Sequence, residues 1–107
     1  MNSQYQIVLM TALNPDEAER IATALVEERL AACVNIFPSC RSVYRWKGAI
    51  VKDQEAMMFA KTKRRDFDAV ARKVASLHSY DVPEIIAVDL KSVSESYGRF
   101  LEEVLGE

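Results

Sequence analysis

The chain has 107 residues, half of them hydrophobic and 28% charged, with a formal net charge of −2. This balance is typical of one folded globular domain spanning residues 1–107, and it excludes a disordered chain. The small negative charge produces no field that attracts nucleic acid or an anionic membrane, so we expect neither as a partner.

The first third of the chain predicts a strand followed by a helix. Residues 5–11 are apolar on both faces toward their end, as in a buried strand. Asn14 is a good N-cap and Pro15 suits the first helical position, so we expect a helix to begin there. Apolar residues then recur at spacings of three and four and form one stripe, which comprises Ala18, Ile21, Ala22, Leu25, Val26 and Leu30.

A hairpin with long arms is predicted over roughly residues 33–62. Pro38 interrupts its first arm and requires a bulge, a bend or an edge position, because proline cannot donate to a ladder. Lys47-Gly48 predicts the turn, and Asp53-Gln54 predicts a kink in the returning arm. Such arms exceed the roughly five or six residues of a common strand, so the hairpin should project and expose its edges. Self-association in a closed ring would cover them.

The second half predicts a helix, a strand and a final helix. Helical spacing begins near Asp66, residues 82–90 form the last strand, and Ser94 caps the last helix. The expected apolar face of that helix carries Tyr97, Phe100, Leu101, Val104 and Leu105. The order is therefore βαββαβ with a C-terminal helix. It predicts a ferredoxin-like α+β fold, in which two helices cover one face of a four-stranded antiparallel sheet.

Several short motifs follow one another in order along the chain. They are Thr11-Ala12-Leu13, Leu30-Ala31-Ala32-Cys33-Val34-Asn35, Ser42-x-Tyr44-x-Trp46-Lys47-Gly48, Glu55, Lys61-Thr62 and His78-x-Tyr80-x-Val82-Pro83-Glu84-Ile85. This ordered set resembles the CutA divalent-cation-tolerance family. The resemblance implies a homotrimer of ferredoxin-like subunits, similar in fold to the PII-type signalling proteins. It also implies metal tolerance and copper binding, without an established reaction. Ser79 departs from the pattern, since the family usually has proline there.

The expected metal ligands are Cys33, His78 and Glu84. Sulfur and imidazole suit copper, so copper is the expected ion and other divalent cations come second. Cys40 is less favoured, because the resemblance gives it no role. Two structural alternatives stay open, a small buried hydrophobe for Cys33 and a C-terminal helix cap for His78.

The two adjacent methionines, Met57 and Met58, should point to opposite faces of a strand. That placement favours core packing over a methionine copper site. The spacing of the cysteines and the histidine matches neither a zinc finger nor an EF-hand, so we expect any metal site to be assembled across subunits, weak or transient.

A cleft at a subunit boundary is expected to gather polar and aromatic side chains from both halves of the chain. The expected members are Tyr44, Trp46, Glu55, Lys61, His78, Tyr80 and Glu84. Tyr44 and Trp46 share one face of the projecting hairpin, which needs a partner. Concave sites of this character often bind ligands. The alternative is that these groups satisfy one another at a buried interface.

Three classes of function are weighed. The first is a trimeric protein that binds or responds to metal ions. The second is a PII-like signalling module that binds a small anionic ligand at the subunit interface, although three glycines form no phosphate loop. The third is an enzyme with a His78/Glu84 acid–base pair, ranked last because a convincing nucleophile is missing. We therefore expect no enzymatic activity.

The expected location is the cytoplasm. Residues 1–4 are polar and lack the pattern of a signal peptide. No apolar run approaches the roughly 20 residues that span a bilayer. Two cysteines are too few for a disulfide scaffold, and free thiols are typical of a reducing compartment.

Overall fold

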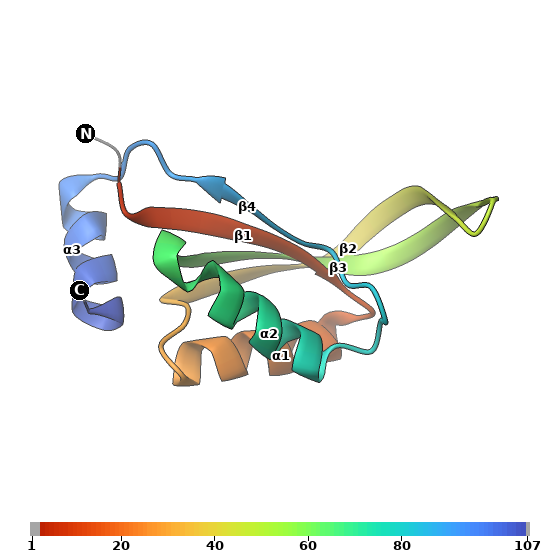
Figure 1. Ribbon diagram of the computed structural model, residues 1–107, viewed down its shortest axis with the longest axis horizontal. Coiled ribbons are helices and arrows are strands. Elements are labelled where there is room, and N and C mark those ends of the chain that lie inside the picture. The colour runs from red at the N-terminus through yellow and green to blue at the C-terminus, as the bar shows by residue number, and fades with distance from the viewer. Residues whose placement is uncertain (1–2, 107) are drawn as a thin grey trace.

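The computed structural model describes residues 3–106, so the polar start at Met1 and Asn2 lies outside the described residues. The strands are β1 (Tyr5–Ala12), β2 (Cys33–Trp46), β3 (Ala49–Lys63) and β4 (Ile85–Asp89). The helices are α1 (Pro15–Glu27), α2 (Phe67–Leu77) and α3 (Glu95–Leu105), with a 3-10 turn, η1 (Arg64–Asp66), before α2. The sheet is antiparallel with the spatial order β2-β3-β1-β4, which confirms the predicted ferredoxin-like fold (Figure 1).

Helices α1 and α2 cover one face of the sheet, and the core lies between this helical layer and the sheet (Figure 1). The period of two in a strand turns alternate side chains of β1 and β3 toward the helices. The sheet's contribution consists of Val8, Met10, Ala12, Ala56, Met58 and Ala60. These side chains pack against Val70 and Val74 of α2 and against four residues of the predicted stripe, all of them buried: Ala18, Ile21, Ala22 and Leu25. Leu30 is only partly buried, and Val26, predicted in the same stripe, is 41% exposed.

Local signals place the start of α1. Asn14 is extended, and its Oδ1 accepts a hydrogen bond of 2.9 Å from the backbone N–H of Glu17. Pro15 occupies the first helical turn, where its missing N–H costs nothing. The predicted N-cap is therefore confirmed.

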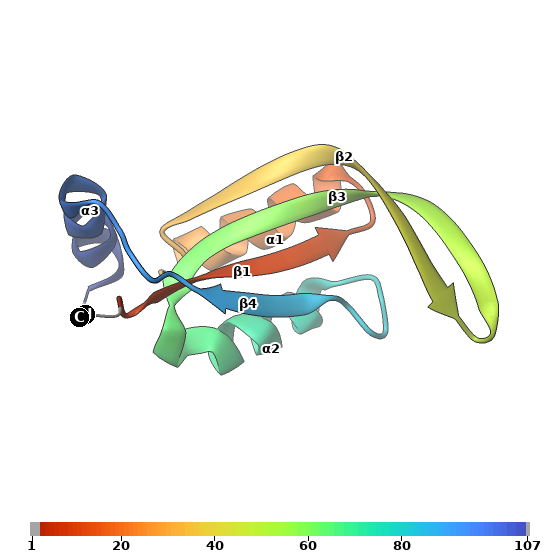
Figure 2. The same cartoon turned by 90° about the horizontal axis from the view of Figure 1, so that it is seen from above.

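The β2–β3 hairpin projects past the rest of the sheet and bends (Figure 2). Phe37 opposes Met57, but Cys40 opposes Glu55, so β2 contains one extra residue at this point. Of the options predicted for Pro38, the structure shows two together, a β-bulge and an edge strand. The kink predicted at Asp53-Gln54 is corrected: those two residues pair regularly, because the irregularity lies in β2.

The hairpin turn and the last strand differ in how well the sequence predicts them. Lys47 and Gly48 both have positive φ, which confirms the predicted turn. Strand β4 begins at Ile85 rather than at Val82. Residues 82–84, which include Pro83, remain in the loop that follows α2, because proline has no N–H to donate to a ladder.

The other face of the sheet bears apolar side chains that α1 and α2 do not cover. This open face comprises Ile7, Leu9, Phe37, Met57, Phe59, Ile86 and Val88. Ile86 is 53% exposed and Val88 59% exposed, and the rings of Phe37 and Phe59 meet edge to face at 5.1 Å. An exposed apolar surface of this kind is typical of interaction sites.

Helix α3 lies at the end of the molecule opposite the hairpin (Figure 1). Ser94 Oγ accepts a hydrogen bond from the N–H of Tyr97, which confirms the predicted cap. Leu101 is buried in a small second core with Tyr5 and Ala32. Tyr97 and Phe100, predicted on the same apolar face, are exposed. Within residues 3–106, no helix has both the length and the apolar character needed to cross a membrane.

Candidate functional site

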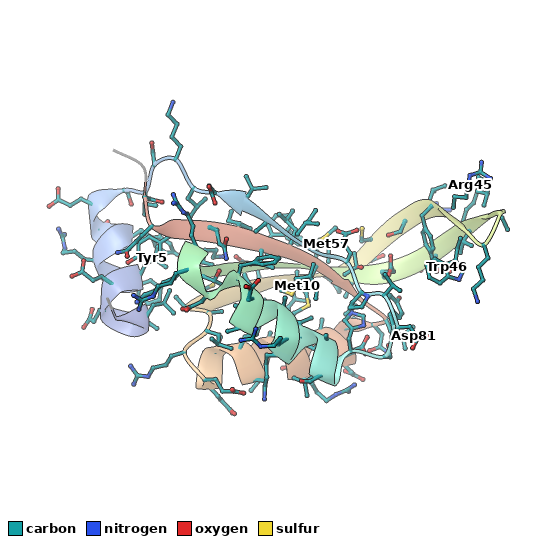
Figure 3. All side chains as sticks on the ribbon, viewed as in Figure 1. Tyr5, Met10, Arg45, Trp46, Met57 and Asp81 are labelled. Carbon is teal, nitrogen blue, oxygen red and sulfur yellow. The ribbon has the colours of Figure 1, made fainter. Side chains whose placement is uncertain are left out.

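A cleft of about 700 Å³ lies between the hairpin and the loop that joins α2 to β4. In Figure 3, Trp46 lies on the projecting hairpin and Asp81 on the loop beside it. The charged, aromatic and sulfur-bearing groups of the lining are Glu55, Asp81, Glu84, Arg41, Tyr44, Trp46, Tyr80, Cys40 and Met57. Three carboxylates thus face one guanidinium among the described residues that line the cleft.

Glu55 and Tyr80 join the two walls of the cleft. Glu55 is only 6% exposed, and its Oε2 accepts a hydrogen bond of 2.8 Å from the hydroxyl of Tyr80. Burial, the hydrogen bond to Glu55 and the carboxylate charge together raise the pKa of Tyr80, so the phenol keeps its proton and remains a donor. The other oxygen, Oε1, has no hydrogen-bond partner among the described residues. Every fully buried side-chain polar atom of those residues is paired, so Oε1 is not fully buried and reaches the solvent of the cleft.

His78 lies behind Tyr80 and does not line the cleft. Its Nδ1 accepts a hydrogen bond of 3.1 Å from the N–H of Tyr80. This places the proton of the neutral ring on Nε2, which donates to the carbonyl oxygen of Thr11 at 2.7 Å. A metal ion at His78 would have to displace one of these two hydrogen bonds.

Glu17 holds the loop that follows His78. It is 2% exposed, and its two carboxylate oxygens accept hydrogen bonds of 2.7 Å from the N–H groups of Leu13 and Ser79. A proline at position 79 would lack that N–H. Burial alone would raise the pKa of Glu17, but the hydrogen bonds from Leu13 and Ser79 outweigh it. The pKa therefore lies below its usual value.

The structure brings together most of the predicted cleft residues. Tyr44, Trp46, Glu55, Tyr80 and Glu84 line one cleft. Lys61 lies outside it. Lys61 shares the face of Glu55, but six residues of strand correspond to roughly 20 Å. Its Nζ instead donates to Asn35 Oδ1.

The three expected metal ligands do not converge within one protomer. Cys33 opposes Lys61, which opposes Ile7, whereas His78 contacts β1 at Thr11. Ile7 and Thr11 are four residues apart on β1, which corresponds to roughly 13 Å along the strand. Glu84 lines the cleft, which neither Cys33 nor His78 does. Among residues 3–106, no three or more His, Cys, Asp or Glu side chains are grouped so as to hold a metal ion.

Sequence reasoning missed the sulfur atoms of the cleft. Met57 and Met58 point to opposite faces as predicted, with Met58 in the core, but Met57 lines the cleft together with Cys40. The face on which Cys40 lies depends on the register beyond the bulge. The only available signal was Pro38, which indicates an irregularity without giving the number of residues it inserts.

The chain is similar to known proteins over almost its whole length. Residues 6–104 match the family described as CutA1 divalent ion tolerance protein. The divalent-cation tolerance protein CutA of Thermus thermophilus is 45% identical over 101 residues, which cover 94% of this chain and 98% of that protein. The chain spans about half the length of the curated CutA relatives from rice, mouse and human.

Solved structures give the same picture. CutA1 from Oryza sativa superposes with a TM-score of 0.93 at 36% identity, covering 99% of this chain and 97% of that chain. A protein of Archaeoglobus fulgidus named the periplasmic divalent cation tolerance protein CutA has a TM-score of 0.91 at 36% identity, covering 94% of this chain and 98% of that one.

The Glu17 network generates a pH-dependent prediction. Glu17→Gln should lower the free energy of unfolding at pH 7 by about 1–3 kcal/mol, because an amide oxygen replaces a charged, doubly accepting carboxylate. Because the pKa of Glu17 is lowered in the folded state, its ionised carboxylate stabilises the fold at pH values above the ordinary carboxyl pKa. This stabilisation is lost as the pH falls through the pKa of the folded state. The difference in unfolding free energy between the wild type and Glu17→Gln should therefore shrink below about pH 4. Urea denaturation from pH 7 to 3 measures it.

The matched control for that experiment is Glu19→Gln, on the exposed side of the same helix. It should change stability little at any pH. A Glu17→Gln deficit that stays constant down to pH 3 would contradict the assigned pKa direction.

Proposed function

The chain belongs to the CutA1 divalent ion tolerance family, and we propose that it is a homotrimeric metal-binding protein whose binding site is the cleft between the hairpin and the α2–β4 loop. The observation that carries this proposal is the charge of the cleft. Among the described residues that line it, Glu55, Asp81 and Glu84 face one guanidinium, that of Arg41. A concave surface with an excess of carboxylates concentrates cations.

Copper is the ion we favour, with other divalent cations second. The cleft offers the thiol of Cys40 in addition to carboxylates, and this softer ligand suits copper. One protomer lacks three grouped His, Cys, Asp or Glu ligands among its described residues. A divalent ion held by such ligands would therefore need a donor from a neighbouring subunit, which is consistent with a cleft at a subunit boundary.

The apolar surface of the protomer supports assembly. The open face of the sheet is uncovered, and the hairpin exposes the large side chains of Val43, Tyr44, Trp46 and Ile50. Burying apolar surface stabilises association by about 25 cal/mol per Å² before the costs of assembly. A closed ring of three copies covers the sheet faces and the edges of the hairpins together. The half-buried free thiols of Cys33 and Cys40 support a reducing, cytoplasmic setting.

A PII-like signalling module is the second candidate. Tyr44, Trp46 and Tyr80 give the cleft aromatic walls, which suit a planar organic ligand. The carboxylates disfavour the small anion expected from the sequence. A binding role is also favoured over a catalytic one, since both nitrogens of the single histidine are engaged by the backbone.

The assembly prediction is tested by sedimentation at micromolar concentration, where one species near three chain masses is expected. Trp46→Ala should shift the equilibrium toward smaller species, because it removes a large exposed apolar side chain from the hairpin. Arg45→Ala is the matched control, since Arg45 lies on the other face of the same strand. A monomeric wild type would overturn the trimer.

The metal prediction is tested by native mass measurement with Cu(II) and Zn(II). Wild type should bind copper with a fixed number of ions per trimer. The double variant Glu55→Gln/Glu84→Gln should lose copper, because it removes two carboxylates from the cleft while keeping the shape of the side chains. Glu103→Gln, exposed on α3, should bind as wild type does. Copper binding that is unchanged in the double variant would place the site elsewhere.

A further inference from the structure

The two cysteines lie on the same face of β2, but each opposes a different charge. Cys33 is paired with Lys61, whereas Cys40 is paired with Glu55. The Cβ atoms of directly opposed residues are about 4.5–5.5 Å apart. A cation that approaches Cys33 therefore meets an ammonium group, and one that approaches Cys40 meets a carboxylate. The surroundings favour a metal ion at Cys40 and disfavour it at Cys33.

The bulge turns Cys40 into the cleft. Phe37 opposes Met57, so regular pairing would place Ser39 opposite Glu55 and point Cys40 to the far face. The extra residue brought in at Pro38-Ser39 shifts the register by one, and Cys40 then opposes Glu55.

A second sulfur atom lines the same cleft as this thiol. Met57 is two residues from Glu55 on β3, so both side chains point to the same face, and both line the cleft with Cys40. Cys40 and Met57 are diagonal neighbours across the paired strands, within reach of a long side chain. The unbranched thioether of Met57 has three rotatable bonds with which to approach the thiol.

The carboxylate of Glu55 completes the set. Its side chain is almost fully buried, and the hydroxyl of Tyr80 fixes Oε2. The other oxygen, Oε1, reaches the cleft without a partner in the described chain. A buried carboxylate with a free oxygen supplies negative charge at a fixed position in the cleft that the two sulfur atoms line.

We propose that Cys40, Met57 and Glu55 form a site for a soft monovalent metal ion, Cu(I) or Ag(I). Thiolate and thioether are the ligands that select Cu(I). When the metal–sulfur bond forms, the thiol proton of Cys40 passes to solvent and no electron is transferred. The inference rests on the proposed metal-binding function of the cleft, and it moves the thiol ligand from Cys33, which the sequence favours, to Cys40.

The test uses the full chain with both cysteine thiols reduced. Ag(I) is the probe, because it keeps its oxidation state during the measurement. Competition with a chromophoric chelator should show affinity lowered at least tenfold in Cys40→Ser and in Met57→Leu. Cys33→Ser should bind as wild type does. In wild type, bound Ag(I) should protect Cys40 but not Cys33 from alkylation, as read by peptide mass; this readout needs no variant to fold.

The outcomes separate this inference from the proposed function. If Cys33→Ser loses Ag(I) while Cys40→Ser retains it, or if Ag(I) leaves Cys40 open to alkylation, the soft site is overturned. The cleft can then still bind Cu(II) through its carboxylates, as the native mass measurement reports. If wild type binds neither Ag(I) nor Cu(II), both proposals fail.

Discussion

The missing N–H of Pro38 is the constraint on which the hairpin and its cleft depend. Because β2 cannot pair regularly there, it takes in one extra residue, and every later side chain changes face. Without the bulge, Arg41, Val43 and Arg45 would lie on the sheet face that bears Glu55. With it, alternate residues from Cys40 to Trp46 face the carboxylate of Glu55. One backbone irregularity thus places the thiol of Cys40 and the rings of Tyr44 and Trp46 on the same face as Glu55.

The opposite wall of the cleft is held by buried polar contacts rather than by a strand. Glu17 on α1 accepts from the backbone at Leu13 and Ser79, and His78 bridges Thr11 and Tyr80. These contacts tie the loop after α2 to the end of β1, where the helix-covered core stops. The cleft therefore lies between a loop anchored to the core and a hairpin that leaves it.

Local signals predicted the elements well. The N-caps at Asn14 and Ser94 and the turn at Lys47-Gly48 depend on neighbouring residues alone, and all three are confirmed. Positions set by pairing between distant strands were harder. Cys40 lies in the cleft because of the strand register beyond Pro38. Lys61 lies outside the cleft because it is six residues along the strand from Glu55. The carboxylate role of Glu17 depends on a loop 62 residues away, which no periodicity reveals.

We propose that another copy of the chain covers the hairpin and closes the cleft. Trp46 is the only tryptophan and is 46% exposed in a single protomer, so its fluorescence reports directly on that claim. Emission and acrylamide quenching should be measured across a dilution series. Our account predicts blue-shifted, protected emission at micromolar concentration, which turns red and becomes quenchable as the assembly dissociates. Red, freely quenched emission at every concentration would contradict it.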